Sequence, residues 1–567
     1  MSALTANRRS WVKGPDRPPL LKHTIGDALA FAAERWGDEL ALISAEQGIH
    51  WSWRQLAERA SALAAGLLAR GLVSGDRIGI WAPNCAEWTL TQFAAAKIGL
   101  ILVTINPAYR RSEVEYTLNK VGVKALVAAE RFKTSDYVGM IENLAPEVGA
   151  SEPGALVCAA LPALKVLIKI GGARRQGWLA FEEVADGAHG DALARVNAIA
   201  GRMRASDAIN IQFTSGTTGS PKGATLSHRN ILNNGYFVGR AMGLRADDRL
   251  CIPVPLYHCF GMVMGNLACV THGAAMVYPS PTFDASAALA CVEAECCTGL
   301  YGVPTMFIAM LGAPDFARFD LTSLRTGCMA GAPCPAEVMQ QVIDRLHMRD
   351  VTIAYGMTET SPVSFQTSPH DPLKRRVSTI GQVQPHLEVK IVDENGQVTA
   401  RGVPGEICTR GYSVMLGYWD DAERTAECLD AEGWMHTGDL GTLDAAGYGN
   451  IVGRIKDMVI RGGENLYPRE IEEFLFGHPK IADVQVVGLP DPRYGEELCA
   501  WIRLHPGERA DEADIRAFCD GQIAHHKIPR YLRFVDEFPM TVTGKIQKFQ
   551  IRKTMIEELG LDERQTA

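Results

Sequence analysis

The chain has 567 residues, of which 47% are hydrophobic and 22% charged, and its formal net charge at pH 7 is −8. This length and composition predict a soluble globular protein of two or more domains and exclude a disordered or fibrous chain. The charges are spread along the sequence without a basic stripe, so we expect no nucleic-acid partner.

Fourteen cysteines are scattered along the chain. No Cys-x-x-Cys motif occurs, and the one adjacent pair is Cys296–Cys297. This spacing favours reduced thiols over a disulfide framework. The most apolar stretch, Trp88–Ile105, contains Gln92 and Lys97 and is not expected to span a membrane. The sequence leaves a loose membrane association and a homodimer open.

The first residues carry Arg8, Arg9 and Lys13 before the first acid, Asp16. Organelle-targeting segments also have an apolar part, which this stretch lacks, so its likeness to one is weak. We therefore expect the cytoplasm, with the mitochondrial matrix as the alternative.

Helical and strand patterns alternate through most of the chain. Thr24 with Asp27 and Ser52 with Gln55 have the spacing of helix-start capping pairs. Apolar runs between helical stretches predict parallel strands joined by crossover helices. The predicted strands are Arg77–Trp81, Leu102–Ile105, Lys124–Ala128, Ala208–Phe213, Leu250–Pro253 and Ala274–Tyr278, with a helix starting at Arg111.

The sequence pattern changes near Glu388. From there, short strand-like runs alternate with turns, which predicts a small β subdomain. A polar glycine-rich stretch, Ile455–Glu464, leads to a helix that begins at Pro468 and ends near Gly477. We predict two domains, residues 1–455 and residues 456–567. From Pro468 onward, the sequence pattern predicts a helix, two strands, a second helix and a further strand, in that order.

The clearest local signal follows the strand Ala208–Phe213. It is the loop Thr214-Ser215-Gly216-Thr217-Thr218-Gly219-Ser220-Pro221-Lys222-Gly223. Hydroxyls, backbone N–H groups and one cation in ten residues are suited to wrapping phosphates. The loop is not a Walker loop, because Pro221 replaces the second glycine and no Ser or Thr follows Lys222.

This loop resembles that of the superfamily of acyl-CoA synthetases, luciferases and peptide-synthetase adenylation domains. Further motifs of that superfamily follow in order: Tyr355-Gly356-Met357-Thr358-Glu359, Gly405-Glu406 with Arg410-Gly411, Thr437-Gly438-Asp439, Gly453-Arg454 and Thr543-Gly544-Lys545. The resemblance covers nearly the whole chain. It implies an α/β fold with two doubly wound subdomains, a small β-barrel and a mobile α+β C-terminal domain.

The resemblance also implies roles for the nucleotide site. Glu359 would hold Mg²⁺ against the phosphates of ATP, and Thr358 would touch the α-phosphate. Asp439 and Arg454 would bind the ribose, because one carboxylate can accept hydrogen bonds from two neighbouring hydroxyls. The adenine would lie between Tyr355-Gly356 and the loop Gly331-Ala332-Pro333.

In the C-terminal domain, Lys545 resembles the family's catalytic lysine, which reaches the acyl oxygen and the α-phosphate. Lys456 matches the hinge about which that domain rotates. A second orientation would bring Gly462 and Gly463 to the site, where they leave room for the pantetheine of coenzyme A. The alternatives for Lys545 and Lys456 are a solvated lysine and a static linker.

For the acid, Tyr257-His258-Cys259-Phe260-Gly261 and Tyr301-Gly302-Val303-Pro304 resemble segments that border the acyl pocket. His258 is the candidate gate, and a satisfied buried histidine is the alternative. Phe283-Asp284-Ala285-Ser286 is similar to a peptide-synthetase motif for an amino-acid amine. Because a helical pattern follows immediately, we predict that Asp284 is an N-cap instead.

Together these motifs predict a fatty-acid–CoA ligase. It would form acyl-AMP and pyrophosphate from an acid and ATP, then transfer the acyl group to coenzyme A with release of AMP. Asn106-Pro107-Ala108-Tyr109 and Ala129-Glu130-Arg131-Phe132-Lys133-Thr134 are most similar to the medium-chain fatty-acid branch. The alternative is a free-standing adenylation enzyme that loads an amino or aryl acid onto a carrier protein. A regulator that kept the fold and lost catalysis is disfavoured by Glu359, Asp439 and Lys545 together.

Overall fold

The computed structural model describes residues 9–186, 190–214, 221–332, 334–461, 464–541 and 545–561. The chain forms two compact units. The larger unit comprises Lys13–Glu388 and Thr409–Met435, and the smaller unit comprises Met1–Val12, Val389–Cys408 and His436–Ala567.

The first sheet of the larger unit has eight strands, most of them parallel. In spatial order they are β10 (Leu179–Ala180), β9 (Val166–Ile170), β6 (Val123–Ala129), β4 (Arg77–Trp81), β5 (Ile101–Thr104), β11 (Ala208–Thr214), β12 (Lys222–Ser227) and β22 (Gly417–Tyr418). The last two strands run antiparallel to their neighbours. A short hairpin of β7 (Arg131–Phe132) and β8 (Ser135–Asp136) stands apart.

The second sheet of the larger unit has nine strands with a parallel centre. Their order is β19 (Gln382–Val383), β18 (Val363–Gln366), β17 (Asp350–Gly356), β16 (Thr326–Ala330), β15 (Gly299–Gly302), β13 (Arg249–Cys251), β14 (Ala275–Tyr278), β2 (Leu40–Ser44) and β3 (Ile49–Ser52). The central strands are buried on both faces, which accounts for their continuous apolar runs. The predicted alternation of strands and crossover helices is confirmed.

Several helices of the larger unit start at a residue whose side chain caps the helix. Thr24 and Ser52 form capping boxes with Asp27 and Gln55, as predicted. Asp284 accepts a hydrogen bond from the backbone N–H of Ala287 at 2.7 Å, so its prediction as an N-cap is also confirmed. The helices are α2 (Ile25–Arg35), α3 (Trp53–Ala69), α4 (Ala86–Ile98), α5 (Arg111–Lys120), α6 (Tyr137–Leu144), α7 (Phe181–Asp186), α8 (Gly190–Ala200), α9 (His228–Ala241), α10 (Ala268–His272), α11 (Ala285–Ala294), α12 (Pro304–Leu311), α13 (Ala336–Arg345), α14 (Leu373–Ser378) and α15 (Ala422–Cys428).

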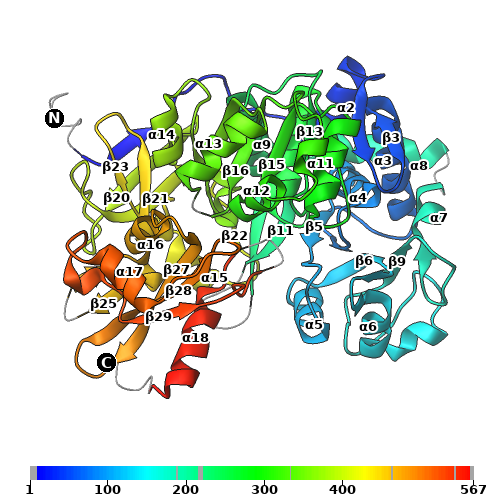
Figure 1. Cartoon of the computed structure of the whole chain (residues 1–567). Coiled ribbons are helices and arrows are strands. Elements are labelled where there is room, and N and C mark those ends of the chain that lie inside the picture. Colours follow the sequence, from blue (N-terminus) through cyan, green and yellow to red (C-terminus); the bar gives the residue numbers. More distant parts are fainter. Residues whose placement is uncertain are drawn as a thin grey trace. The chain divides into compact units, whose positions relative to one another are not determined.

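The crossover helices pack on the sheets whose strands they connect. Figure 1 shows α11, α12 and α13, in green, alongside β13, β15 and β16 of the nine-stranded sheet. One core cluster contains Ile78 of the first sheet, Leu250 of the second, and the fully buried Trp53 and Trp88 of α3 and α4. The two sheets of the larger unit therefore share one hydrophobic core, to which α3 and α4 contribute.

The smaller unit contains two further sheets. One has the order β1 (Trp11–Lys13), β20 (Leu387–Val392), β21 (Gly405–Gly411), β23 (Met435–Leu443) and β24 (Gly449–Arg454), and the ends of some strands extend into residues of the larger unit. The other contains β26 (Glu464–Leu466), β25 (Val459–Arg461), β28 (Gly495–Leu504), β27 (Ile481–Asp491) and β29 (Tyr531–Phe534). The predicted order of elements after Pro468 is confirmed, and a last helix, α18, follows them.

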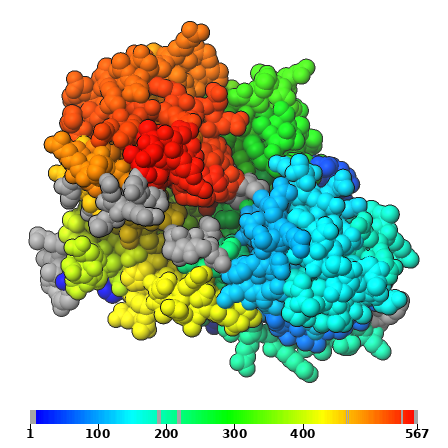
Figure 2. Space-filling model, turned by 90° about the horizontal axis from the view of Figure 1, so that it is seen from below, coloured from blue at the N-terminus to red at the C-terminus, as the bar shows by residue number. Residues whose placement is uncertain are grey.

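Three helices pack on the second of these sheets: α16 (Pro468–Phe476), α17 (Glu512–Cys519) and α18 (Lys548–Leu559). In Figure 2 the orange to red residues that include these helices gather in one continuous body. Short 3-10 or π segments complete the chain: η1 (Pro146–Ala150), η2 (Phe260–Leu267), η3 (Phe316–Arg318), η4 (Thr358–Thr360), η5 (Ile455–Asp457) and η6 (His525–Lys527).

Two exclusions made from the sequence can be compared with the structure. All fourteen cysteines are free thiols, most of them buried, as the spacing predicted. In the described parts of the chain, no helix combines the length and apolar character needed to cross a membrane. The stretch Trp88–Ile105 instead forms most of α4 and the buried strand β5.

Candidate active site

The phosphate-loop segment connects two neighbouring strands of the larger unit. Thr214 ends β11 and Lys222 begins β12, and their Cα atoms are direct partners in the antiparallel register. The loop between them therefore leaves and re-enters the sheet at one point. Its predicted phosphate ligands Ser215, Gly216, Thr217, Thr218 and Gly219 lie outside the described residues.

Glu359 lies in η4, which follows the carboxyl end of β17 in the nine-stranded sheet. The residue is buried, with 5% of its surface exposed. Its Oε1 atom accepts a hydrogen bond from Thr214 Oγ1 at 3.1 Å. Thr358, its neighbour, is also buried. The structure thus brings together two of the predicted site residues, Thr214 and Glu359, from the two sheets of the larger unit.

Tyr418 is a member of this cluster that the sequence analysis did not identify. Its hydroxyl donates a hydrogen bond to Glu359 Oε1 at 2.8 Å, and Lys222 Nζ lies over its ring at 4.7 Å from the centroid. Burial, with the nearby Glu359 charge as a second cause, raises the pKa of Tyr418 well above its usual value. The phenol therefore remains a hydrogen-bond donor. Its place on β22, beside β12, was not evident from any local motif.

The segment before Tyr418 is fixed from both sides. Met415 N donates to the carbonyl oxygen of Glu359 at 2.9 Å, and Leu416 N donates to that of Thr225 at 2.9 Å. Asn230 Nδ2 donates to the carbonyl oxygens of Tyr412 and Val414. The backbone of Glu359 is thereby tied to the same segment that carries Tyr418.

The predicted adenine-binding residues follow adjacent parallel strands. Ala330, the last residue of β16, is the register partner of Ala354 in β17, so Gly331-Ala332 and Tyr355-Gly356 lie at the same sheet edge. Carboxyl ends of parallel strands are where α/β sheets bind ligands. A Cβ at position 356 would collide with the carbonyl oxygen of Pro362, so the turn into η4 requires glycine. Pro333 lies outside the described residues.

His258 immediately precedes a short buried π-helix, η2. Its Nδ1 accepts a hydrogen bond from Phe260 N at 3.3 Å, and its ring meets Tyr257 edge-on with centroids 6.3 Å apart. The helix packs on the phosphate-loop strand, because Cys259 Sγ contacts Gln212 Oε1 at 3.1 Å. Short π segments occur frequently at functional sites. His258 is half-buried and its neighbour Cys259 contacts β11, and the role of His258 as an acyl gate stays a prediction.

In the smaller unit, Asp439 and Arg454 are register partners on β23 and β24. Arg454 Nε lies 2.9 Å from Asp439 Oδ1. The Asp439 carboxylate is nearly buried, whereas half of the Arg454 side chain is exposed. Thr437 Oγ1 accepts a hydrogen bond from Asp439 N and donates one to the carbonyl oxygen of Ile407. The predicted ribose pair therefore forms one ion pair held by the strand backbone.

The hinge and coenzyme A predictions fall on the next residues. Lys456 lies in η5, directly after Arg454, and its side chain is exposed. Gly462 and Gly463 lie outside the described residues, and the positions that flank them, Arg461 and Glu464, are register partners on β25 and β26. Arg461 is held by an ion pair with the buried Glu497 at 2.8 Å.

Lys545 lies in the smaller unit, four positions after Thr541. Thr541 N donates to the Lys545 carbonyl oxygen at 2.7 Å, and Lys545 N donates to Thr541 Oγ1 at 3.1 Å. Both bonds are local and use the backbone of Lys545. The Lys545 side chain is half-buried.

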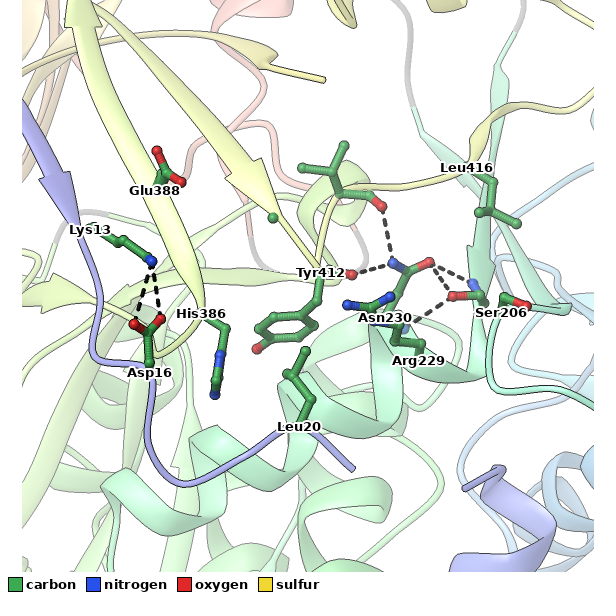
Figure 3. Close-up of a pocket in the computed structure, with 13 residues that line it drawn as sticks. Lys13, Asp16, Leu20, Ser206, Arg229, Asn230, His386, Glu388, Tyr412 and Leu416 are labelled. Carbon is green, nitrogen blue, oxygen red and sulfur yellow. Dashed lines mark hydrogen bonds and ion pairs between the residues drawn. The ribbon is translucent and has the colours of Figure 1, made fainter. Parts of the chain in front are cut away.

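A pocket of about 520 Å³ lies on the larger unit (Figure 3). Its wall includes the ion pair Lys13–Asp16, and it ends at Leu416, on the segment that holds Glu359. None of the predicted site residues that the structure describes lines this pocket. Its lining contains both cations and carboxylates, so it favours no ligand of a single charge.

Comparison with family models gives two matches. One described as AMP-binding enzyme covers residues 29–419, and one described as AMP-binding enzyme C-terminal domain covers residues 470–545. The chain is 45% identical to medium-chain acyl-CoA ligase ACSF2, mitochondrial, of Danio rerio, over 97% of this chain and 91% of that protein. It is 44% identical to the protein of the same name from Homo sapiens, over 97% and 91%.

Solved structures share the fold over almost the whole chain. The anthranilate CoA ligase AuaEII in complex with anthranoyl-AMP superposes with a TM-score of 0.85 at 27% identity, covering 96% of this chain and 99% of that one. A fatty acyl CoA synthetase of Mycobacterium tuberculosis superposes with a TM-score of 0.69 at 25% identity, covering 94% and 99%.

Proposed function

This chain belongs to the AMP-binding enzyme family and is an AMP-forming acid–CoA ligase, and we propose that its acid is a medium-chain fatty acid. The names of relatives 44–45% identical to it support that chain length. The observation that carries the catalytic assignment is the buried cluster of Glu359, Thr214 and Tyr418 beside Lys222.

The reaction has two steps. A carboxylate oxygen of the acid bonds to the α-phosphorus of ATP while the bond to pyrophosphate breaks, which leaves acyl-AMP. The sulfur of coenzyme A then bonds to the acyl carbon while the bond to AMP breaks, and the thiol proton is released. Both steps bring anions together, so neutralising charge is the main task of the site.

Lys222 and the loop that it closes are proposed to bind the β- and γ-phosphates. A lysine and a turn rich in backbone N–H groups suit this, because they supply positive charge without a fixed geometry. Thr358 is proposed to donate a hydrogen bond to the α-phosphate. Tyr355 and Gly331-Ala332 are proposed to contact the adenine from neighbouring strand ends.

Glu359 is proposed to hold Mg²⁺. The donor set fits, because a carboxylate is a hard ligand for this hard cation. Thr214 and Tyr418 both donate to the Oε1 atom of Glu359, so the two hydrogen bonds use only one of the two carboxylate oxygens. When bound, Mg²⁺ would neutralise phosphate charge as pyrophosphate leaves.

Asp439 is proposed to accept hydrogen bonds from the two ribose hydroxyls, and Arg454 is proposed to fix the orientation of that carboxylate. What supports this is their ion pair at 2.9 Å and the near-complete burial of Asp439, which strengthens its hydrogen bonds. A bound ribose would then have one fixed orientation relative to β23.

Residues 456–567 are proposed to act as a mobile domain that turns at Lys456. In one state Lys545 would stabilise the negative charge on the acyl and phosphate oxygens, and in the other Gly462 and Gly463 would leave room for pantetheine. Replacing Lys456 with proline restricts the backbone at the hinge. We expect Lys456→Pro to retain one half-reaction and lose the other, whereas equal retention of both would contradict the hinge.

His258 is proposed to border the acid, at the point where η2 meets β11. For the compartment we propose the cytoplasm; the mitochondrial location in the names of the relatives makes the matrix the alternative, and fractionation of the source cells separates the two.

The proposed substrate is tested by ATP–pyrophosphate exchange across a panel of fatty, aryl and amino acids, with coenzyme A consumption measured in parallel. We expect the highest kcat/KM for medium-chain fatty acids and stoichiometric acyl-CoA. Exchange limited to amino or aryl acids, without use of coenzyme A, would instead support an enzyme that loads a carrier protein.

A further inference from the structure

Three side chains that can bind a metal converge beside the Asp439 strand of the smaller unit. They are Glu406, Cys408 and His436, and their ligand atoms all lie within 4.8 Å of one another. Glu406 and Cys408 are two residues apart on β21, so both point to one face of the sheet. His436 comes from the neighbouring strand β23.

The distances within this triad approach those of a metal site. His436 Nδ1 lies 2.8 Å from Glu406 Oε2 and 3.5 Å from Cys408 Sγ. Zinc bonds of about 2.0–2.3 Å in a tetrahedron set the ligand atoms roughly 3.3–3.7 Å apart. The oxygen and nitrogen would have to separate by about half an ångström, which a side-chain rotation provides, while Cys408 Sγ and the Glu406 carboxylate lie within 4.8 Å of each other.

The donor types and their exposure indicate which metal would bind. A thiolate with an imidazole favours zinc and similar ions over Mg²⁺ or Ca²⁺, which prefer oxygen ligands. Cys408 is fully buried, while Glu406 and His436 remain 19% and 33% exposed. Solvent can therefore reach the open side and supply a fourth ligand.

We propose that Glu406, Cys408 and His436 form a binding site for a thiophilic divalent metal of the Zn²⁺ class, with water as the fourth ligand. The site links β21 to β23 and is distinct from the Mg²⁺ role proposed for Glu359. It does not depend on the proposed function, because binding is measured without substrates.

A second contact connects this site to the rest of β23. Glu406 Oε1 accepts a hydrogen bond from Gly438 N at 3.0 Å. The carboxylate thus holds the turn before Asp439 with one oxygen and faces His436 with the other. Hydrogen bonds of this kind orient metal-binding side chains in other proteins. Without a metal, the same carboxylate forms a hydrogen-bonded pair with His436.

The direct test uses Co²⁺ as a spectroscopic probe for the zinc site. Tag-free protein in a non-thiol reductant is titrated with Co²⁺, and Zn²⁺ is then added as a competitor. We expect a thiolate-to-cobalt charge-transfer band with one equivalent bound, and its loss when Zn²⁺ displaces Co²⁺. X-ray absorption of the zinc-loaded protein should show one sulfur and otherwise nitrogen or oxygen neighbours.

Variants identify the ligands. Cys408→Ser should abolish the band, and His436→Gln should weaken Co²⁺ binding by roughly tenfold or more. Replacing a residue that only hydrogen-bonds to a metal ligand already lowers metal affinity by about that factor. Cys296→Ser is the matched control, because Cys296 is an exposed thiol elsewhere in the chain. We expect this control to bind Co²⁺ as the unmodified protein does.

Either of two results would overturn the proposal. One is the absence of a sulfur ligand in the metal-loaded protein. The other is a charge-transfer band that survives in Cys408→Ser and disappears in Cys296→Ser. Should Cys408→Ser fail to fold, His436→Gln and the X-ray absorption measurement on the unmodified protein decide the outcome.

Discussion

The Glu359 cluster of the larger unit and the Lys545 site of the smaller unit are built in opposite ways. Glu359 receives hydrogen bonds from Thr214 and Tyr418, residues that are 145 and 59 positions away in the sequence. The backbone of Lys545 forms two hydrogen bonds with Thr541, four positions before it. The Glu359 cluster is built from long-range hydrogen bonds, whereas these two hydrogen bonds of Lys545 are local.

This difference separates two kinds of mutational effect. A side chain in the buried cluster has partners that lose a hydrogen bond when it is replaced, so stability and activity should change together. The two hydrogen bonds between Lys545 and Thr541 use the Lys545 backbone, so they persist when the Lys545 side chain is replaced. Its replacement should change activity and leave folding almost unaffected.

The largest effect is expected for Lys545→Ala. Removing a group that stabilises transition-state charge typically lowers kcat by about 100-fold to 1,000-fold. We expect a loss of that size in ATP–pyrophosphate exchange, and retention of acyl-CoA formation from supplied acyl-AMP. The control is Lys553→Ala, because Lys553 is a mostly exposed lysine on α18. Equal loss of both half-reactions would show that Lys545 has another role.

Glu359→Gln is expected to have the next largest effect. Glutamine can still accept the hydrogen bonds of Thr214 and Tyr418, but it lacks the charge that would hold Mg²⁺. We expect the Mg²⁺ concentration for half-maximal exchange to rise by about 100-fold. Glu423→Gln, on the exposed first turn of α15, is the matched control. An unchanged Mg²⁺ dependence would remove Glu359 from the metal site.

Asp439→Asn tests the ribose pair. In this pair the buried carboxylate of Asp439 faces Arg454, its register partner on the neighbouring strand. A hydrogen bond to a charged group contributes about 1.5–3 kcal/mol, so the KM for ATP should rise roughly tenfold or more. Arg454→Gln should give a smaller increase, and the double variant less than the sum of both, because the two residues form one ion pair. Strictly additive effects would indicate that the residues act separately.

Local sequence patterns predicted the elements that local interactions determine. The strand Arg77–Trp81, the capping boxes at Thr24 and Ser52 and the N-cap Asp284 were all confirmed. Other strand boundaries moved by a residue or two: Leu102–Ile105 became Ile101–Thr104, for example. Strand ends depend on pairing with neighbouring strands, which a single segment does not contain.

Local sequence patterns did not predict the side-chain clusters. Tyr418 stands 196 positions after Lys222, and the pairing of β22 with β12 joins segments that no local pattern contains. The triad of Glu406, Cys408 and His436 depends in the same way on strands that are joined through a long connection. Motif order pointed to Glu359, Asp439 and Arg454, but it did not predict the hydrogen bond from Tyr418 to Glu359.

The smallest effect is expected for Tyr418→Phe, and it tests the comparison most directly. This variant removes the hydroxyl that donates to Glu359 Oε1 and keeps the ring below Lys222 Nζ. Because donor and acceptor are both buried, we expect a loss of about 1–3 kcal/mol in unfolding free energy and a severalfold lower kcat/KM for ATP. Tyr236→Phe is the control, since the Tyr236 ring stacks on His272 and this contact does not need the hydroxyl. A fall in kcat/KM without any loss of stability would show that the cluster behaves like the Lys545 site, and that long-range hydrogen bonds do not couple function to folding here.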